Sequence, residues 1–173
     1  MFRVGEDVEG CLRSTRDGRM KIYSHLGRLR DVWARHPVYF ITTCTAGRRP
    51  LLANPIAHRI LDEEWRILSA RRGWSVGRYV IMPDHVHFFV APAGPEAEPL
   101  SEAIGLWKKW SSIALRRAAA FEAPLWQREF FDHLLRSGES REEKWHYVRE
   151  NPVRAGLVVR AEDWPYAGVI DFE

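Results

Sequence analysis

The sequence predicts an α+β protein in which a ferredoxin-like antiparallel sheet carries helices on one face, with a further helix near the C-terminus. Segments rich in β-branched and aromatic residues alternate with segments of helical periodicity, in the order strand, helix, strand, strand, helix, strand, helix. The length of 173 residues favours one domain that can bury its own core. A hydrophobic content of 46% and a charged content of 28% are typical of a globular chain and argue against disorder.

The first element follows a charged N-terminal extension, expected at residues 1–35, and opens a single domain expected at residues 36–173. Residues 36–43 (HPVYFITT) have the composition of a strand, and the basic turn at residues 47–50 (GRRP) breaks it. Asn54 followed by Pro55 has the pattern of an N-cap and a proline at the first helical position. Apolar residues at helical spacing extend this helix to about residue 71.

The next elements are two strands, a loop and a second helix. Residues 74–82 and 85–91 are strand candidates that can form a hairpin across Pro83 and Asp84. Residues 92–99 (PAGPEAEP) have loop composition, and Ser101 is a candidate N-cap for a helix that runs to about residue 120.

The last predicted elements are a fourth strand over residues 125–136 and a short helix. Residues 140–143 (SREE) fit a capping box that opens this helix. It is expected to end near Asn151, because the residue before a proline avoids the α region. The C-terminal part beyond it is expected to be irregular.

Composition also limits the cellular setting. Two cysteines, Cys11 and Cys44, cannot form a disulfide framework, which favours a reducing, cytoplasmic location. No apolar stretch approaches the roughly 18 residues of a membrane span, and the first twenty residues lack an apolar signal core. The net charge of +3 permits a polyanionic partner without requiring one.

The sharpest local motif is His85-Val86-His87. Residues i and i+2 of a strand point to the same side, about 6.5 Å apart, so two imidazoles placed in this way can hold one metal ion. The alternative is a pair of unrelated histidines on a half-exposed strand. Val86 and Phe88 are expected to face the core, and Asp84 is expected to be a turn residue whose side chain lies on the other face.

The short C-terminal helix offers a second set of reactive groups. Tyr147 and Asn151 are four residues apart and are expected to share one helical face. The Asn151 carbonyl oxygen can bind a hard cation, and the Tyr147 hydroxyl can attack a phosphate that Mg²⁺ or Mn²⁺ polarises. Simple packing beside Trp145 and Val148 is the alternative. His146 lies about 100° around the helix and is not expected to join this face.

These residues carry a family resemblance that covers about residues 36–167 but not residues 1–35. The segment 82–88 (MPDHVHF) resembles the His-hydrophobic-His segment of single-tyrosine HUH transposases. The segments 126–127 (WQ), 131–136 (FDHLLR), Tyr147 ahead of 151–158 (NPVRAGLV), and 163–165 (DWP) resemble the REP-associated tyrosine transposases. The order and spacing of these motifs are highly specific.

The resemblance implies a single-strand DNA endonuclease on a ferredoxin-like fold. His85, His87 and Asn151 would hold a divalent metal, Mg²⁺ or Mn²⁺, and Tyr147 would attack a backbone phosphate. The attack forms a 5′-phosphotyrosine and releases a 3′-OH, and its reversal joins strands. The implied partner is a short DNA hairpin with a specific tetranucleotide at its foot, bound by a monomer or a homodimer.

Basic surfaces are the expected DNA contacts, although each single charge is as easily explained by solvation. Either Trp107 or Trp110 can stack an unpaired base, but burial is the favoured expectation for them. His133, in one of the family-like segments, is a further candidate, with a structural role as its alternative. The expected basic contacts are Arg48, Arg49, Lys108, Lys109, Arg116, Arg117 and Arg154.

Two other functions stay open at this stage. A related chain without catalysis would bind structured single-stranded nucleic acid through the same sheet and helices. A small Zn²⁺ hydrolase would need a third histidine or a carboxylate near the pair and would leave Tyr147 without a role.

Overall fold

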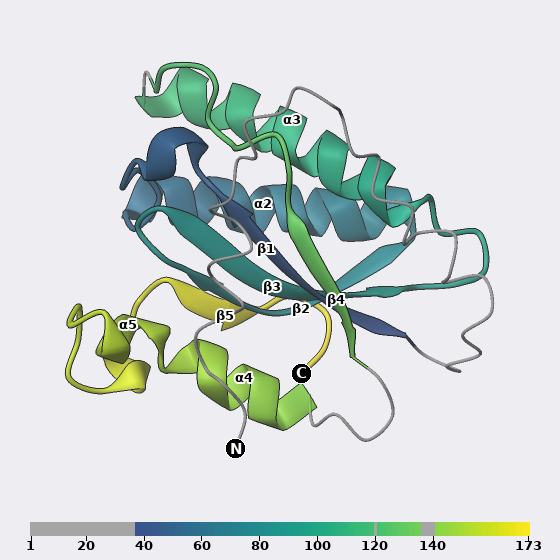
Figure 1. Cartoon of the computed structure of the whole chain (residues 1–173). Coiled ribbons are helices and arrows are strands. Elements are labelled where there is room, and N and C mark those ends of the chain that lie inside the picture. Colours follow the sequence, from purple (N-terminus) through teal and green to yellow (C-terminus); the bar gives the residue numbers. More distant parts are fainter. Residues whose placement is uncertain (1–36, 120, 136–140) are drawn as a thin grey trace, which may run out of the picture. The chain divides into compact units, whose positions relative to one another are not determined.

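Five strands form one antiparallel sheet in the order β4-β1-β3-β2-β5 (Figure 1). The computed structural model describes residues 37–119, 121–135 and 141–173, so the predicted extension 1–35 and the predicted cap Ser140 lie outside the described residues. The first four strands have the ferredoxin-like arrangement, and the predicted fold class is confirmed. The strands are β1 (Val38–Cys44), β2 (Trp74–Ile81), β3 (His85–Pro92), β4 (Phe131–Leu135) and β5 (Ala167–Val169).

Helices cover both faces of the sheet. The two long helices connect β1 to β2 and β3 to β4 and lie together on one face, whereas the C-terminal helices lie on the other (Figure 1). The helices are α2 (Pro55–Arg72), α3 (Leu100–Ala119), α4 (Arg141–Arg149) and α5 (Asn151–Arg154), with 3-10 turns η2 (Ala46–Arg48) and η3 (Ala161–Asp163). Within the described residues, no helix is long and apolar enough to cross a membrane.

Helix α2 begins and ends at the residues that carry local signals. The Asn54 side chain accepts a hydrogen bond from the backbone N–H of Ala57 at 2.9 Å, and Pro55 follows it. Gly73 ends the helix with a φ of 69°, in the left-handed region that glycine tolerates. The predicted start of this helix is therefore confirmed.

The layer between α2, α3 and the sheet is an aromatic core. The rings of Trp65 and Trp107 stack with centroids 5.5 Å apart, and Phe88 from β3 lies 5.2 Å from each of them. Trp126 packs on Trp107 from the following loop. Trp107 is thus buried as expected, whereas Trp110 is 47% exposed.

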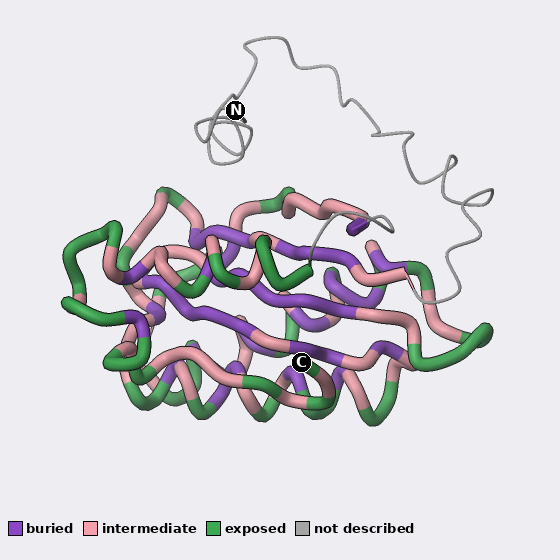
Figure 2. The backbone as a smooth tube through the Cα atoms, turned by 90° about the horizontal axis from the view of Figure 1, so that it is seen from below, coloured by how far each residue is buried: buried purple, intermediate pink, exposed green. Residues whose placement is uncertain are grey.

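A second apolar cluster lies on the opposite face, beneath α4. Its members come from the sheet, from the turn after β2 and from the single buried residue of α4. Figure 2, seen from this side, shows the buried stretches along the central strands. Trp145, Tyr147 and Trp164 are partly buried at its edge. The buried members of this α4-face cluster are Phe40, Val80, Met82, Phe89, Leu135 and Val148.

Three expectations about elements were wrong. Ser101 does not cap α3, because the helix begins at Leu100 and the Pro99 carbonyl accepts the first N–H groups. The strand predicted over 125–136 is shorter, since the carbonyls of residues 127–129 accept hydrogen bonds from Lys108 Nζ. The C-terminal part is not irregular throughout, because β5 pairs with β2 and Gly168 gives room for the Tyr79 hydroxyl beside it.

Candidate functional site

The histidine pair lies near the start of β3, on the face that α4 covers. The ring centroids of His85 and His87 are 4.7 Å apart, and the His87 ring stacks on Phe40 of the α4-face cluster at 5.3 Å. Val86 and Phe88 are fully buried, and Phe88 joins the aromatic core on the other face. The alternation expected from the strand pattern therefore brings the two imidazoles together.

Each imidazole is oriented by a neighbour at Nδ1. His85 Nδ1 lies 2.6 Å from Oδ1 of Asp84, and His87 Nδ1 lies 2.8 Å from Oγ1 of Thr42 on β1. Histidines that bind metals commonly use one ring nitrogen for the metal and the other for such a partner. Both rings thus have Nε2 available for a ligand, which supplies two of the donors that a divalent metal needs.

Asp84 is a turn residue as expected, but its side chain does not lie on the far face. It precedes the first residue of β3, so the strand alternation does not apply to it, and its carboxylate reaches the adjacent His85. Its other oxygen lies 2.8 Å from Nε of Arg48. The contact with Thr42 was also missed, because it depends on the register between β1 and β3.

Electrostatics favour neutral His87 and ionised Asp84. Burial lowers the pKa of His87 well below its ordinary value, and the electrostatic interactions with His85 and Lys144 act in the same direction. For Asp84, burial acts to raise the pKa, but the hydrogen bond and the electrostatic interaction with His85, together with Arg48, outweigh it and lower the pKa. A neutral imidazole is the form that binds a metal.

Tyr147 and Asn151 come from two consecutive helices and do not share a single one. Helix α4 ends at Arg149 and α5 begins at Asn151. Arg154 connects them, because its guanidinium lies 4.1 Å from the centroid of the Tyr147 ring and donates to the Tyr147 carbonyl and to Oδ1 of Asn151. Tyr147 packs at the edge of the α4-face cluster, which also contains the ring stacked on His87.

A complete set of three metal ligands is not assembled in the described part of the chain. No group of three His, Cys, Asp or Glu side chains converges there, so the third ligand that the Zn²⁺ hydrolase alternative needs is missing among these residues. The Asn151 carbonyl oxygen, the expected third ligand, accepts a hydrogen bond from Arg154. The two imidazoles fit a metal, and Asn151 would have to release Arg154 to join them.

Four of the expected DNA contacts are occupied within the protein. Arg48 contacts Asp84 and the thiol of Cys44, and Arg49 donates to the carbonyls of Ala46, Glu122 and Pro124. Lys108 donates to the carbonyls of residues 127–129. Arg154, the fourth of these residues, donates to the Tyr147 carbonyl. All four side chains therefore bind neighbouring segments of the protein itself.

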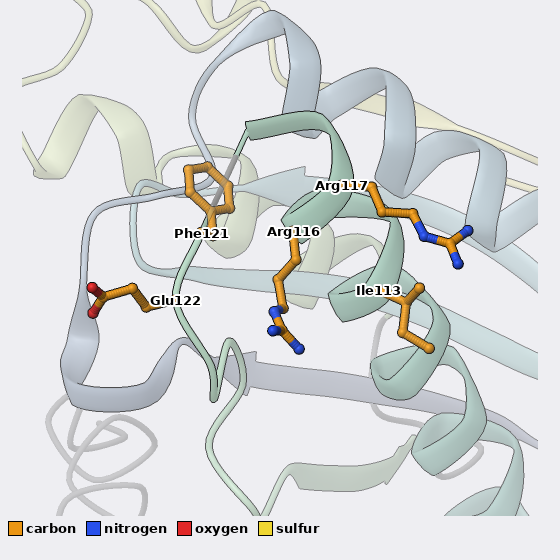
Figure 3. A pocket seen from close by; sticks show the side chains of 5 residues that line it. All are labelled: Ile113, Arg116, Arg117, Phe121 and Glu122. Atoms are coloured by element: carbon orange, nitrogen blue, oxygen red, sulfur yellow. The ribbon is translucent and has the colours of Figure 1, made fainter.

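The other expected contacts are more accessible. Lys109, Arg116 and Arg117 are exposed on α3, and His133 is half-buried on β4 beside Phe131. A hollow of about 540 Å³ is lined by Ile113, Arg116, Arg117, Phe121 and Glu122 (Figure 3). A second hollow of about 320 Å³ shares Arg116 and is lined also by Lys108, Lys109 and Arg128. We call these two hollows the α3 groove.

Comparisons with known proteins agree with this architecture. The family model described as "Transposase IS200 like" matches residues 35–151. A "Putative REP-associated tyrosine transposase" of Haemophilus influenzae is 30% identical over 95 residues, which is 50% of this chain and 54% of that protein. A "REP-associated tyrosine transposase" of Escherichia coli K12 is 24% identical over 144 residues and covers 82% of both chains.

Solved structures show the same fold. The structure of a REP-associated tyrosine transposase bound to a REP hairpin superposes with a TM-score of 0.58 at 23% identity and covers 76% of this chain and 74% of that one. A putative transposase from Deinococcus radiodurans gives a TM-score of 0.51 at 18% identity and covers 79% of this chain and 97% of that one. The similarity to REP-associated tyrosine transposases that the motifs indicate is confirmed.

Proposed function

The chain belongs to the IS200-like transposase family, and on that premise we propose that it cleaves and rejoins single-stranded DNA with Tyr147 as the nucleophile. The observation that supports this proposal most strongly is that His87 of the histidine pair and Tyr147 pack against the same apolar cluster. Phe40, which stacks on His87, belongs to the α4-face cluster, and Tyr147 packs against the same cluster. A phosphate at this face would have both the imidazoles and the phenol around it.

The proposed reaction exchanges one phosphoester for another. The Tyr147 oxygen attacks phosphorus, the bond to the 3′ oxygen breaks, and the phenolic proton is lost as the 3′ oxygen leaves as a hydroxyl. The product is a 5′-phosphotyrosine, and attack by a second 3′-OH reverses the step and frees Tyr147. Because the phosphoester bond is conserved in the adduct, rejoining requires no nucleotide cofactor.

A divalent cation, Mg²⁺ or Mn²⁺, is part of this proposal. His85 and His87 would hold it through Nε2, since their Nδ1 atoms are engaged by Asp84 and Thr42. Asn151 would be the third protein ligand after it leaves Arg154. When bound, such an ion polarises a phosphate oxygen and stabilises charge on it.

The proposed substrate is a DNA hairpin with a single-stranded foot. Two relatives are named for their association with REP elements, and one related structure is described as bound to a REP hairpin. In this chain, Lys109, Arg116 and Arg117 of the α3 groove would contact the phosphate backbone. The exposed Trp110 would stack an unpaired base, and the enzyme would act in the cytoplasm as a monomer or homodimer.

A second candidate is a protein that binds the hairpin without cutting it. The hydrogen bond between Arg154 and Asn151 favours this alternative, because it occupies the oxygen that the metal would need. The two candidates share the fold and the α3 groove. They differ in whether a covalent adduct with Tyr147 forms.

A denaturing gel with labelled hairpins from the DNA flanking the gene tests the proposal. With Mg²⁺ or Mn²⁺, the wild type should give a protein–DNA adduct, which Tyr147→Phe, chelation, and the double change His85→Ala and His87→Ala should each abolish. Tyr39→Phe is the matched control, since Tyr39 pairs with Val90 at the opposite end of β1 from the histidine pair.

Two results would count against the proposal. Cleavage by Tyr147→Phe would refute the assignment of the nucleophile. Binding by the wild type without an adduct, across several hairpins and both metals, would favour the non-catalytic binder.

A further inference from the structure

The connection between β1 and α2, which contains η2, is hydrogen-bonded to the turn between β2 and β3 that precedes the histidine pair. The backbone N–H of Thr45 donates to the Asp84 carbonyl at 2.8 Å, and the Thr45 hydroxyl, which lies 2.8 Å from the Arg49 carbonyl, is also within 3.1 Å of the Asp84 carbonyl. Further along the same connection, the N–H of Leu52 donates to the Pro83 carbonyl at 2.8 Å. The turn between β2 and β3 is therefore attached at two points to the connection between β1 and α2.

From this arrangement we propose that Arg48 is a positioning residue that fixes His85 through the carboxylate of Asp84. Arg48 Nε lies 2.8 Å from Oδ2, and His85 Nδ1 lies 2.6 Å from Oδ1 of the same carboxylate. One oxygen faces each neighbour, so the plane of the carboxylate is defined from both sides. The inference rests on the proposed metal site, because it assigns a purpose to the orientation of His85.

The contact also selects one tautomer of His85. An ionised carboxylate can only accept hydrogen bonds, so the hydrogen of a neutral imidazole must be on Nδ1. The lone pair on Nε2 is then free for a metal. The side chains of Arg48, Asp84 and His85 are 29%, 23% and 14% exposed, so this series of contacts is only partly open to solvent and to its screening.

The backbone of Arg48 supports a role for its side chain. Among the described residues, Arg48 is the one non-glycine residue with a positive φ, at 56°. Such a conformation is strained for a residue with a Cβ and persists where the surroundings hold it. A glycine here would relieve the strain but would lose the contact with Asp84 and the contact with the Cys44 thiol at 2.7 Å.

The competing explanation is that Arg48 binds a DNA phosphate, as the basic turn suggests from sequence. Nε of Arg48 already contacts Asp84 and Nη1 contacts Cys44, so a phosphate would have to bind through Nη2 or displace one of these partners. A phosphate contact and a positioning contact predict different effects, because only the first depends on the number of counterions released from DNA.

The test uses the full chain with Arg48→Gly, which suits the positive φ, and Arg48→Lys, which keeps one charged nitrogen near Asp84. Arg66→Ala is the matched control, since Arg66 forms an exposed ion pair with Asp62 on α2. Nitrogen NMR of the histidine rings in metal-free protein, above the ordinary histidine pKa of about 6.5, reports the tautomer of His85. Calorimetric titration with Mn²⁺ alone reports the affinity.

We expect the wild type and Arg66→Ala to hold His85 with its hydrogen on Nδ1. Arg48→Gly should give a mixture of tautomers and bind Mn²⁺ about tenfold more weakly, the lower end of the effect expected for a partner behind a metal ligand. Arg48→Lys should recover part of both properties. The salt dependence of hairpin binding should be the same in all of these proteins.

An unchanged tautomer and unchanged Mn²⁺ affinity in Arg48→Gly would overturn the inference, and a shallower salt dependence in that variant would assign Arg48 to the DNA. If the wild type binds no Mn²⁺, the proposed metal site fails. In that case the NMR comparison still decides whether Arg48 orients His85.

Discussion

The hydroxyl of Thr42 gives a sharp test of how His87 is held. Thr42 pairs with His87 in the register of β1 and β3, and its Oγ1 lies 2.8 Å from Nδ1 of an imidazole that is only 8% exposed. Thr42→Val keeps the branched shape and the strand preference but removes this hydrogen-bond partner. The imidazole Nδ1 then has no hydrogen-bond partner and little access to water.

The expected cost follows from this burial. Leaving a buried polar group without a partner costs about 1–3 kcal/mol. For a domain of this size, a loss of that magnitude lowers the melting temperature by about 2–4 °C per kcal/mol. Loss of the partner of a metal-binding imidazole should also weaken Mn²⁺ binding by about 10–100-fold.

Thr43 supplies a control at the adjacent position. Its side chain is fully buried, and its hydroxyl finds no hydrogen-bond partner among the described residues. Thr43→Val should therefore leave the free energy of unfolding unchanged or raise it, because it removes an unsatisfied buried hydroxyl. Urea denaturation and Mn²⁺ titration of both variants check this, and equal stability and equal metal affinity in the two would refute the reasoning.

Two further predictions concern packing and the α3 groove. Gly77→Ala would put a Cβ 2.8 Å from the Phe172 ring and should destabilise the fold by about 1–3 kcal/mol, measured by thermal denaturation. Gly105→Ala, whose added Cβ meets open space, is the control. A Gly77→Ala variant as stable as the wild type would contradict this close packing. The double change Arg116→Ala and Arg117→Ala should lower the slope of log affinity against log salt by about 1.4–1.8 in hairpin binding if each arginine contacts one phosphate, and an unchanged slope would exclude the groove as the DNA site.

The elements that sequence predicted well are those with strong local signals. The side-chain cap of Asn54 and the left-handed Gly73 lie at the two ends of α2, where a short pattern suffices. The placement of Val86 and Phe88 on one face of β3 and of the two histidines on the other could also be predicted, because it depends only on the alternation of neighbouring residues. Strand β3 is central and covered on both faces.

What sequence could not predict depends on contacts between distant segments. The three residues of β5 give too short a pattern to recognise, and they form a strand because Gly168 fits against Tyr79 of β2. The link from Arg48 to Asp84 joins residues on two separate connections, so the sequence predicted a DNA contact or a solvated charge for Arg48 and not this ion pair. Likewise, the spacing of Tyr147 and Asn151 suggested one helix, whereas a break and Arg154 set their arrangement.

The central position of β3 has a consequence for how this protein can change. Phe88 packs against both Trp65 and Trp107 on one side of the strand, and its neighbour His87 is on the other. Protein interiors are close-packed and compress little, so a larger residue among those rings would shift the strand, whereas a smaller one would leave a cavity beneath it. The aromatic core therefore fixes the position of the strand that carries the imidazoles. Substitutions in this core, on the face of the sheet opposite the histidines, are limited by the need to keep the histidine pair in place.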